Sequence, residues 1–394
     1  MVDMPENTEN TENTDCIIIG AGPAGLATAR ELMRAGRRVL VLEQGTAVAT
    51  SWRAHRPGLR LHTVRQLSGL PGLRIPRRYG RYVTSENLVR YLEHYRAVFA
   101  IDVRFGSTVL RVERSDATGR VPGWVVVTAT GHRHRAATVI MATGYNRHPH
   151  IPDLPGLWEF TRPYLHVAEY AGGSQFAGRD VLVVGAGNAA AEAATAMAAA
   201  GAGRVRMAVR TTPHIVRRSI WGVPMQTFAI VSALLPIPVA DRLAAVLSGL
   251  TIPDLSLRGL PRPRPDLYTR VRRDRAVPVH DTGIVGSIEC GAVTPVAAVA
   301  GFTPHSVRLA DGSVIEPEVV VFATGYRRGL ERMIGALALL DSRGNPRARS
   351  GTAAATGFYF VGFTVSATGA LRQLARDARR VARRESKRVD VIRW

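Results

Sequence analysis

Short apolar runs separated by glycine-rich turns and helical patterns recur along this chain. The run at residues 16–19 is followed by Gly20-Ala21-Gly22-Pro23-Ala24-Gly25, then by a helical pattern and a second run at residues 39–42. Short apolar runs without alternation are typical of parallel strands buried on both faces, and a helix commonly connects such strands. The pattern therefore predicts a strand, a turn, a helix and a second strand.

The glycines of this turn have separate physical roles. Gly20 permits the tight turn, Gly22 lets a pyrophosphate approach bare backbone, and Gly25 lets the helix pack closely on the strand. The first helical turn, with Pro23 and Ala24, presents free N–H groups and the positive end of the helix dipole. We predict that the turn binds a dinucleotide.

The same unit recurs in the middle of the chain. Here the apolar run at residues 181–184 leads to Gly185, Gly187 and Asn188, and Ala190 occupies the position of the third glycine. Alanine is tolerated there because this position governs helix packing and does not contact the phosphate. A second dinucleotide site is therefore predicted.

The two units differ in charge where their second strands end. Glu43, followed by Gln44, closes the first unit, whereas Arg210 closes the second. A carboxylate suits a free ribose hydroxyl, and a guanidinium can grip a 2′-phosphate through two parallel hydrogen bonds. We predict FAD in the first site and NADPH in the second. The alternative for Arg210 is an ordinary solvated surface arginine.

Two further strands end in Ala-Thr-Gly-Tyr. The run at residues 139–142 leads to Thr143 and Gly144, and the run Val319–Phe322 precedes the second copy. Small residues there let backbone amides approach a cofactor, so Thr143 and Gly144 join the predicted FAD site. The second copy is expected to return the chain to the first domain.

The loop after Glu43 holds further candidates. Trp52 and Arg53 could pack on the flavin and hold its phosphates, although a core tryptophan beside a surface arginine fits the spacing equally well. His62 could face the flavin ring and is the candidate catalytic residue. A lone histidine is more often a hydrogen-bonded structural residue.

Other elements complete the predicted FAD domain. Residues 85–99 have helical periodicity, with Ser85 as the expected N-cap. Val109 lies in a predicted strand, and we include this residue in the predicted cofactor site. Gly362 follows a third apolar run. A helix predicted to begin near Ala370 would direct its dipole at the flavin.

The net charge of +21 arises from 52 basic and 31 acidic residues, and Lys387 is the only lysine. Nucleic-acid binding is one interpretation of such a charge. No aromatic-interleaved basic module or zinc pattern accompanies it, so a compositional bias is preferred and no specific nucleic-acid partner is predicted. The positive field favours anionic ligands.

The two cysteines, Cys16 and Cys290, form no CxxC pair, so neither a disulfide framework nor a metal site is predicted. The N-terminus has no basic region followed by an apolar run, so no signal peptide is predicted and a cytoplasmic location is expected. Residues 1–14 include repeated Glu-Asn-Thr and are predicted to be a disordered tail.

Residues 219–240 contain no charged side chain and are long enough to span a membrane. Pro224, Pro236 and Pro238 interrupt the segment, and Asp241 follows it at once. We expect this apolar insert, taken as residues 219–250, to form a hydrophobic wall for a substrate or to associate weakly with a membrane surface.

The chain resembles the class B flavin-containing monooxygenases, and within them the YUCCA-type enzymes that act on indole-3-pyruvate. The resemblance spans roughly residues 15–380 and rests on GAGPAG, LRLHT, LHVAEY, VVGAGNAAAE, both ATGY motifs and FVGF. The family signature FxGxxxHxxx[FY] keeps Phe160, His166 and Tyr170, whereas Arg162 replaces its glycine. His62 matches the position at which many of these enzymes have asparagine near the flavin.

The resemblance implies an α/β protein with two Rossmann-like domains. The NADPH domain (residues 161–326, with the apolar insert) interrupts a discontinuous FAD domain (residues 15–160 and 327–394). It also implies that NADPH reduces FAD, which reacts with O₂ to give a C4a-(hydro)peroxyflavin that oxygenates a small molecule. An aromatic 2-oxo acid undergoing oxidative decarboxylation is the preferred substrate.

Three other functions compete with this one. A disulfide reductase would need a redox CxxC, which the chain lacks. N- or S-oxygenation of amines or thioethers shares all the predicted motifs. A membrane- or nucleic-acid-binding protein with a vestigial cofactor fold would purify without flavin.

Overall fold

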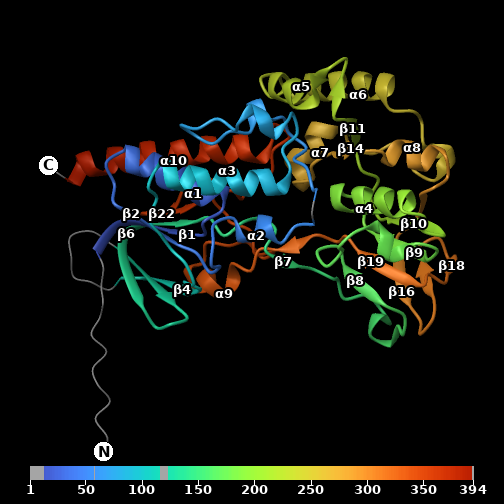
Figure 1. The fold of residues 1–394 in the computed structure, drawn as a ribbon, viewed down its shortest axis with the longest axis horizontal. Coiled ribbons are helices and arrows are strands. Elements are labelled where there is room, and N and C mark those ends of the chain that lie inside the picture. Colours follow the sequence, from blue (N-terminus) through green and yellow to red (C-terminus); the bar gives the residue numbers. More distant parts are fainter. Residues whose placement is uncertain (1–12, 57, 116–122, 393–394) are drawn as a thin grey trace, which may run out of the picture. The chain divides into compact units, whose positions relative to one another are not determined.

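The computed structural model describes residues 13–56, 58–115 and 123–392 (Figure 1). Contacts divide the chain into two compact units. Unit 1 comprises Met1–His148, Arg327–Thr364 and Ala370–Trp394, and unit 2 comprises Pro149–Tyr326 and Val365–Gly369. The chain passes between them at β7 (His148–Pro149) and β20 (Tyr326–Arg327). Unit 2 begins earlier along the chain than residue 161, because the proline-rich segment after His148 makes its contacts within unit 2.

Unit 1 is built on an eight-stranded sheet with a parallel centre. Its order is β21 (Ala353–Ala355), β22 (Phe358–Phe360), β6 (Arg133–Met141), β1 (Asn13–Ile19), β2 (Val39–Leu42) and β3 (Val103–Arg104). The antiparallel strands β4 (Val109–Arg114) and β5 (Trp124–Thr128) branch from β6. The predicted strand–turn–helix–strand unit is therefore β1, α1 and β2.

Helices bury the apolar faces of this sheet (Figure 1). They are α1 (Pro23–Arg34), α3 (Ser85–Val98), α9 (Glu331–Ile334) and α10 (Ala370–Ile392), whereas the short helix α2 (Thr50–Arg53) packs against α3. The prediction that Ser85 caps α3 is wrong. Thr84 is the N-cap, because its backbone is extended and its hydroxyl accepts a hydrogen bond from the Asn87 N–H at 3.3 Å.

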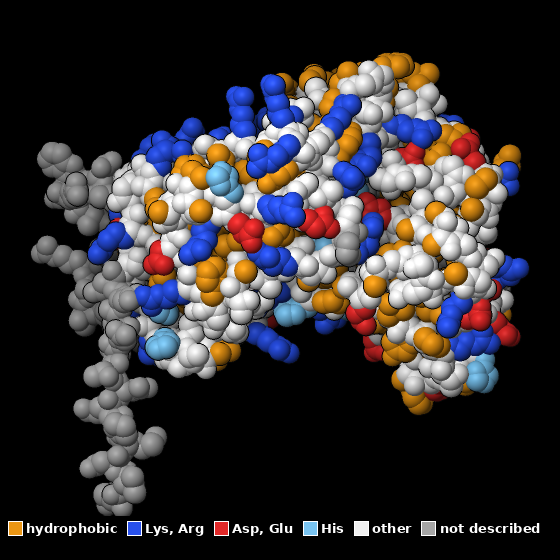
Figure 2. Space-filling view, in the orientation of Figure 1, with side chains coloured by type: hydrophobic (Ala, Val, Ile, Leu, Met, Phe, Trp, Pro, Cys, Tyr) orange, Lys and Arg blue, Asp and Glu red, His pale blue; other side chains and the backbone are white. Residues whose placement is uncertain are grey.

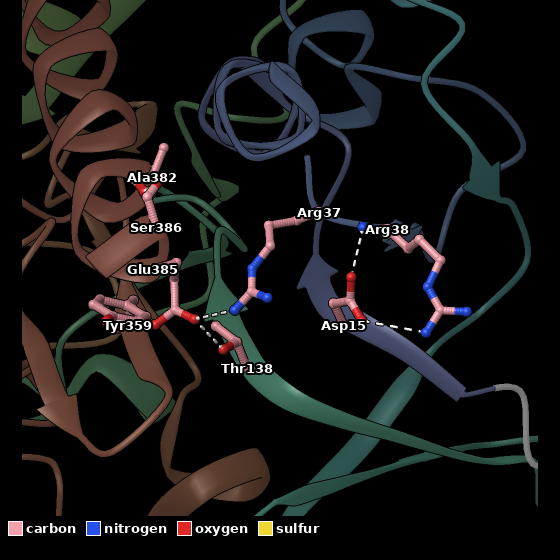
Figure 3. Close-up of polar contacts among 8 residues, drawn as sticks. All are labelled: Asp15, Arg37, Arg38, Thr138, Tyr359, Ala382, Glu385 and Ser386. Carbon is pink, nitrogen blue, oxygen red and sulfur yellow. Dashed lines mark hydrogen bonds and ion pairs between the residues drawn. The ribbon is translucent and has the colours of Figure 1, made fainter. Parts of the chain in front are cut away.

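A buried carboxylate fixes α10 to the sheet (Figure 3). Glu385 accepts hydrogen bonds from the hydroxyls of Thr138 on β6 and Tyr359 on β22, both at 2.7 Å, and pairs with Arg37 at 3.3 Å. Burial, reinforced by the charge of Glu385, raises the pKa of the neighbouring Cys16 thiol to about 12. Because Cys16 stays protonated and buried, it has the role of a core side chain.

Unit 2 has a five-stranded parallel sheet. The order is β15 (Thr294–Ala297), β10 (Arg204–Val209), β9 (Asp180–Val184), β19 (Val319–Phe322) and β8 (Tyr164–His166), with helices α4 (Asn188–Ala199) and α8 (Ile284–Glu289). An antiparallel ribbon adds β16 (Val299–Phe302), β17 (Val307–Leu309) and β18 (Val314–Ile315). The prediction of an α/β protein with two Rossmann-like units is confirmed.

The apolar insert folds as two separate helices. The strands β11 (Ile215–Arg217) and β14 (Val279–Asp281) pair at its base. The insert contains β12 (Ser219–Ile220), β13 (Val223–Pro224), α5 (Met225–Ser232) and α6 (Ile237–Thr251), and α7 (Leu267–Asp274) follows it in the chain. Pro224 and Pro236 precede α5 and α6, where a missing N–H costs least. Across the described part of the chain, every helix is too short or too polar to cross a bilayer.

Candidate cofactor sites

The turn between β1 and α1 can be built only with glycine at two positions. Gly20 has φ +107°, and a Cβ added there would lie 2.6 Å from the carbonyl oxygen of Ala142 at the end of β6. A Cβ on Gly25 would lie 1.9 Å from the carbonyl oxygen of Gly20. Both distances are far below van der Waals contact, so the close approach of the turn to β6 and α1 depends on these glycines.

The outer side of the same turn is open. A Cβ added to Gly22 would meet no atom within 4 Å, and Gly22 is the N-cap of α1. The first-turn N–H groups of α1, including those of Ala24 and Gly25, have no acceptor within the helix. This bare, positively polarised backbone is the site that a pyrophosphate requires.

Glu43 is held rigidly at the end of β2. Its buried carboxylate accepts hydrogen bonds from the N–H of Ala21 at 2.7 Å, the N–H of Gly45 at 2.9 Å and the hydroxyl of Thr50 at 3.1 Å. A carboxylate has about four acceptor positions, so it retains capacity for a ribose hydroxyl. Glu43 therefore both fastens the glycine turn and presents an acceptor beside it.

The first Ala-Thr-Gly segment supplies a polar atom that fits a ligand. The hydroxyl oxygen of Thr143 is buried and has no hydrogen-bond partner among the described residues. Thr143 lies against the glycine turn, since its Cα is 3.3 Å from the position of a Cβ on Gly20. An unsatisfied buried hydroxyl is costly, and a bound cofactor can satisfy it. The residues of unit 1 therefore fit FAD.

Gly144 and Gly362 complete the small-residue surface around the turn. Both have φ +90°. A Cβ on Gly362 would lie 3.1 Å from the Cβ of Ala24 in the first turn of α1. The structure thus brings the predicted Gly362 to the same end of α1 as the turn, although more than 300 residues separate them in sequence.

The predicted loop residues of unit 1 are already engaged with the protein. Trp52 is half-buried, packs against the core beside α1 and meets the ring of His55 edge-on, with centroids 5.4 Å apart. Arg53 donates to the carbonyl of Val48 at 3.0 Å and pairs with Glu93 of α3. A phosphate contact by Arg53 would therefore compete with this ion pair.

The remaining candidates lie in three different places. The side-chain oxygen of Gln44 accepts a hydrogen bond from Arg147 at 3.0 Å. Val109 is buried at the start of β4. His62 is half-buried in the loop that precedes Val64, and its neighbour Thr63 bonds Ser68 at 2.8 Å. None of these contacts assigns a role to the three residues, which remain predictions.

The second turn reproduces the frame of the first. Gly185 has φ +132°, and a Cβ there would lie 2.6 Å from the carbonyl oxygen of Ala323 at the end of β19. Gly187 is open, with no atom within 4 Å of an added Cβ. Asn188, the first residue of α4, donates to the carbonyl of Pro278 at 3.0 Å and accepts from the N–H of His280 at 2.8 Å. Asn188 thereby orients the helix that faces the second site.

Arg210 follows β10 directly and is exposed. Its guanidinium makes no hydrogen bond or ion pair with another residue of the described ranges, unlike Arg206 of the same strand, which pairs with Asp180 at 2.7 Å. An unengaged guanidinium beside an open glycine turn fits the 2′-phosphate of NADPH.

His166 holds the second Ala-Thr-Gly segment in place. Its Nδ1 accepts a hydrogen bond from the Ala168 N–H at 3.1 Å, so the ring proton is on Nε2, which donates to the Gly325 carbonyl at 3.0 Å. Burial lowers the pKa of His166 and favours this neutral form. Sequence reasoning identified His166 only as part of a motif, because its partner lies 159 positions away.

A pocket in unit 2, named here the insert pocket, lies between the apolar insert and the strands and helix beside it. It encloses about 600 Å³ of empty space, including its open mouth. Gln226 and Ala229 of α5, Ala244 and Leu247 of α6, and Tyr268 of α7 are among its lining residues. Burial raises the pKa of Tyr268, which therefore stays a neutral phenol. No Asp, Glu, Lys or Arg side chain lines the pocket in the described part of the chain.

Comparison with known proteins decides the family. A family model described as pyridine nucleotide-disulphide oxidoreductase matches residues 17–225. The indole-3-pyruvate monooxygenase YUCCA1 of Oryza sativa subsp. japonica is 35% identical over 316 residues, which are 79% of this chain and 76% of that protein. The probable indole-3-pyruvate monooxygenase YUCCA4 of Arabidopsis thaliana is 32% identical over 354 residues, 88% and 84% of the two chains. The chain belongs to the class B flavin-containing monooxygenases.

Solved structures with low sequence identity share the fold. A flavin-containing monooxygenase from Stenotrophomonas maltophilia superposes with a TM-score of 0.73 at 23% identity and covers 96% of this chain and 100% of that one. The OTEMO complex with FAD and NADP gives a TM-score of 0.70 at 20% identity, covering 96% and 84%. The predicted enzyme class, a flavoprotein monooxygenase that uses FAD and NADPH, is confirmed by family membership.

Proposed function

We propose that this monooxygenase converts an aromatic 2-oxo acid, such as indole-3-pyruvate, into the carboxylic acid shorter by one carbon. The observation that supports this substrate is the identity of 30% or more with several enzymes named for indole-3-pyruvate. The reaction consumes the 2-oxo acid, O₂, NADPH and a proton, and it releases CO₂, water and NADP⁺. One oxygen atom enters the new carboxylate and the other leaves as water.

Reduced flavin supplies the activation of O₂ when it is bound, and the chain positions the two cofactors. We assign the pyrophosphate of FAD to the open backbone at Gly22 and its ribose to Glu43, with the Thr143 hydroxyl as a further donor. We assign the pyrophosphate of NADPH to Gly187 and its 2′-phosphate to Arg210. These assignments are supported by the open turns and the unengaged hydroxyl and guanidinium.

His62 is proposed as the polar side chain nearest the reacting oxygen. The LRLHT motif places it in the loop after the first dinucleotide unit, and it is half-buried. An imidazole there would donate or accept a hydrogen bond while the surrounding side chains exclude water. The two free cysteines, Cys16 and Cys290, and the requirement for NADPH support a cytoplasmic location.

A second candidate, N- or S-oxygenation of an amine or thioether, is supported by the insert pocket. Its described lining holds no arginine or lysine to balance a substrate carboxylate, and it suits an uncharged, largely apolar molecule. Such a substrate gains one oxygen atom and loses no carbon.

Product analysis distinguishes the two candidates. The purified yellow enzyme is supplied with NADPH, O₂ and either indole-3-pyruvate or a neutral thioether such as thioanisole. We expect substrate-dependent NADPH oxidation with one CO₂ released per NADPH for the keto acid. If the thioether gains one oxygen atom and the keto acid releases no CO₂, the first proposal is overturned in favour of the second.

A further inference from the structure

Exposed apolar side chains collect on one part of unit 2, namely α5, α6 and the loop that follows. Figure 2 shows hydrophobic side chains along the upper edge over these helices. We define the insert face as the large exposed apolar residues of this region: Val231, Leu234, Leu235, Val239, Leu243, Val246, Leu250 and Leu257. Leu234 is 83% exposed and Leu257 is 97% exposed, so this region carries apolar surface that nothing in the described chain covers.

Four of these residues form a continuous stripe on α6. Val239, Leu243, Val246 and Leu250 follow the spacing i, i+4, i+7 and i+11, which normally marks the side of a helix that faces a core. On α6 that core-facing side is already occupied, because Ala240 is buried and other α6 residues line the insert pocket. The outer stripe is therefore a second apolar side, and apolar patches of this kind mark interaction sites.

A tryptophan stands at the tip of the hairpin that leads into α5. Trp221 lies between β12 and β13 and is 85% exposed. Its φ of +48° is in the left-handed region, which a bulky residue rarely adopts. Exposed tryptophan is typical of segments that sit at the interface between lipid and water.

The charge around the insert face selects its partner. Residues 231–275 contain eight arginines and four aspartates, with no lysine or glutamate. Arg242 lies beside the stripe on α6 and Arg258 follows Leu257, and both are exposed. Asp241 is buried, where it caps the N-terminus of α7 through the Tyr268 N–H at 2.6 Å. A second copy of this cationic face would be repelled, whereas an anionic surface is attracted.

We propose that the insert face docks unit 2 on the surface of an anionic lipid bilayer. The apolar stripe enters the boundary between headgroups and acyl chains, and Arg242 and Arg258 pair with lipid phosphates. The helices lie along the surface and do not cross it, in agreement with their length and the buried Asp241. This inference is independent of the substrate proposed above.

Vesicle flotation of the full-length, flavin-loaded enzyme tests the proposal. Vesicles of phosphatidylcholine alone are compared with equimolar phosphatidylcholine and phosphatidylglycerol. We expect binding to the anionic vesicles that weakens with added salt, and Val246→Glu is expected to weaken it roughly tenfold. Val314→Glu is the matched control, because Val314 is a similarly exposed valine of unit 2 outside the insert face (58% against 62%). Arg242→Gln is expected to weaken binding roughly fivefold on anionic vesicles only.

Two flotation results and one light-scattering result would overturn the proposal. Failure of the enzyme to float with anionic vesicles, or equal losses with Val246→Glu and Val314→Glu, contradicts lipid docking. Light scattering that shows a dimer, converted to a monomer by Val246→Glu, would assign the face to a second copy. Unchanged flavin absorbance and NADPH oxidation in solution verify that each variant is folded, so failure of docking is distinguishable from loss of the enzyme.

Discussion

The two nucleotide turns of this enzyme share one frame and differ in what faces the ligand. In each turn, a Cβ added to the first glycine would lie 2.6 Å from a carbonyl oxygen of an Ala-Thr-Gly segment. That oxygen belongs to Ala142 in the first turn and to Ala323 in the second. In each, the second glycine is open. The frame is set by how closely backbone must approach backbone, and both copies retain it.

The side chains around the frame diverge. Buried Glu43 fastens the first turn, whereas exposed Arg210 closes the second unit. The hydroxyl of Thr143 has no partner in the described residues, whereas that of Thr324 donates to the carbonyl of His150. These differences indicate that the side chains around the turn determine which ligand binds, whereas the backbone geometry of the turn is the same in both copies.

The largest expected effect comes from the third position of the turn. Gly25→Ala places a methyl group 1.9 Å from the Gly20 carbonyl oxygen, and we expect a loss of roughly 3 kcal/mol in unfolding free energy together with loss of FAD. Ala190→Gly, at the corresponding position of α4, should cost only about 1 kcal/mol and leave the FAD content unchanged. Flavin-to-protein absorbance and thermal unfolding measure both. Full flavin content in Gly25→Ala would refute the packing argument.

Removal of the cationic side chain tests the difference between the two sites. Arg210→Ala is expected to lower kcat/KM for NADPH roughly 10- to 100-fold, because a charged hydrogen-bonded pair is lost, and to leave NADH unaffected. Anaerobic flavin reduction by each coenzyme is the measurement. Arg204→Ala, an exposed arginine at the start of β10, is the control. Equal losses with NADPH and NADH would show that Arg210 does not read the phosphate.

The paired threonines should respond in opposite ways. Thr143→Val removes no hydrogen bond within the described protein, so it should weaken FAD binding roughly fivefold and leave the stability of the apoprotein unchanged. Thr324→Val removes the bond to His150, so it should lower the unfolding free energy by about 1 kcal/mol without affecting FAD. Flavin titration and denaturant unfolding separate the two effects. The same response from both variants would contradict the assigned difference.

The smallest expected effect is the contribution of His166 to the pH dependence of the unfolding free energy. Burial lowers the pKa of His166 in the folded protein below its ordinary value of 6.5, so the unfolded chain binds more protons below about pH 6.5. Stability should therefore fall as the pH drops from about 6.5, by at most about 1.4 kcal/mol per pH unit for this histidine. Thermal unfolding from about pH 8 to pH 5 should show a shallower slope for His166→Gln. An unchanged slope would exclude His166 as a contributor.

Much of the frame could be predicted from sequence because it depends on local requirements. The spacing of Gly20, Gly22 and Gly25 follows from one turn and one helix end, and the same holds for Gly185 and Gly187. Charge at the strand ends indicated the cofactor pair. The helix near Ala370 begins where predicted.

Features that depend on distant contacts could not be predicted in this way. The Nε2–H of His166 donates to Gly325, which lies 159 positions away in sequence. The insert pocket needs α5, α6 and α7 to pack together. The engagement of Arg53 with Glu93 requires α3 to lie against α2. Thr84 and Ser85 are both good N-caps, and only the backbone conformation chooses between them.

The position of β22 has a consequence for the order in which the protein is made. Phe358, Tyr359 and Phe360 cover residues 139–141 of β6, next to Thr143, yet they leave the ribosome only after Pro149–Tyr326 has been synthesised. Until then this half of β6 is an uncovered edge, and Glu385 has not yet arrived to bind Thr138. The flavin unit is thus completed last, and a chain that ends between Gly369 and α10 has all of unit 2 but lacks the last helix of unit 1.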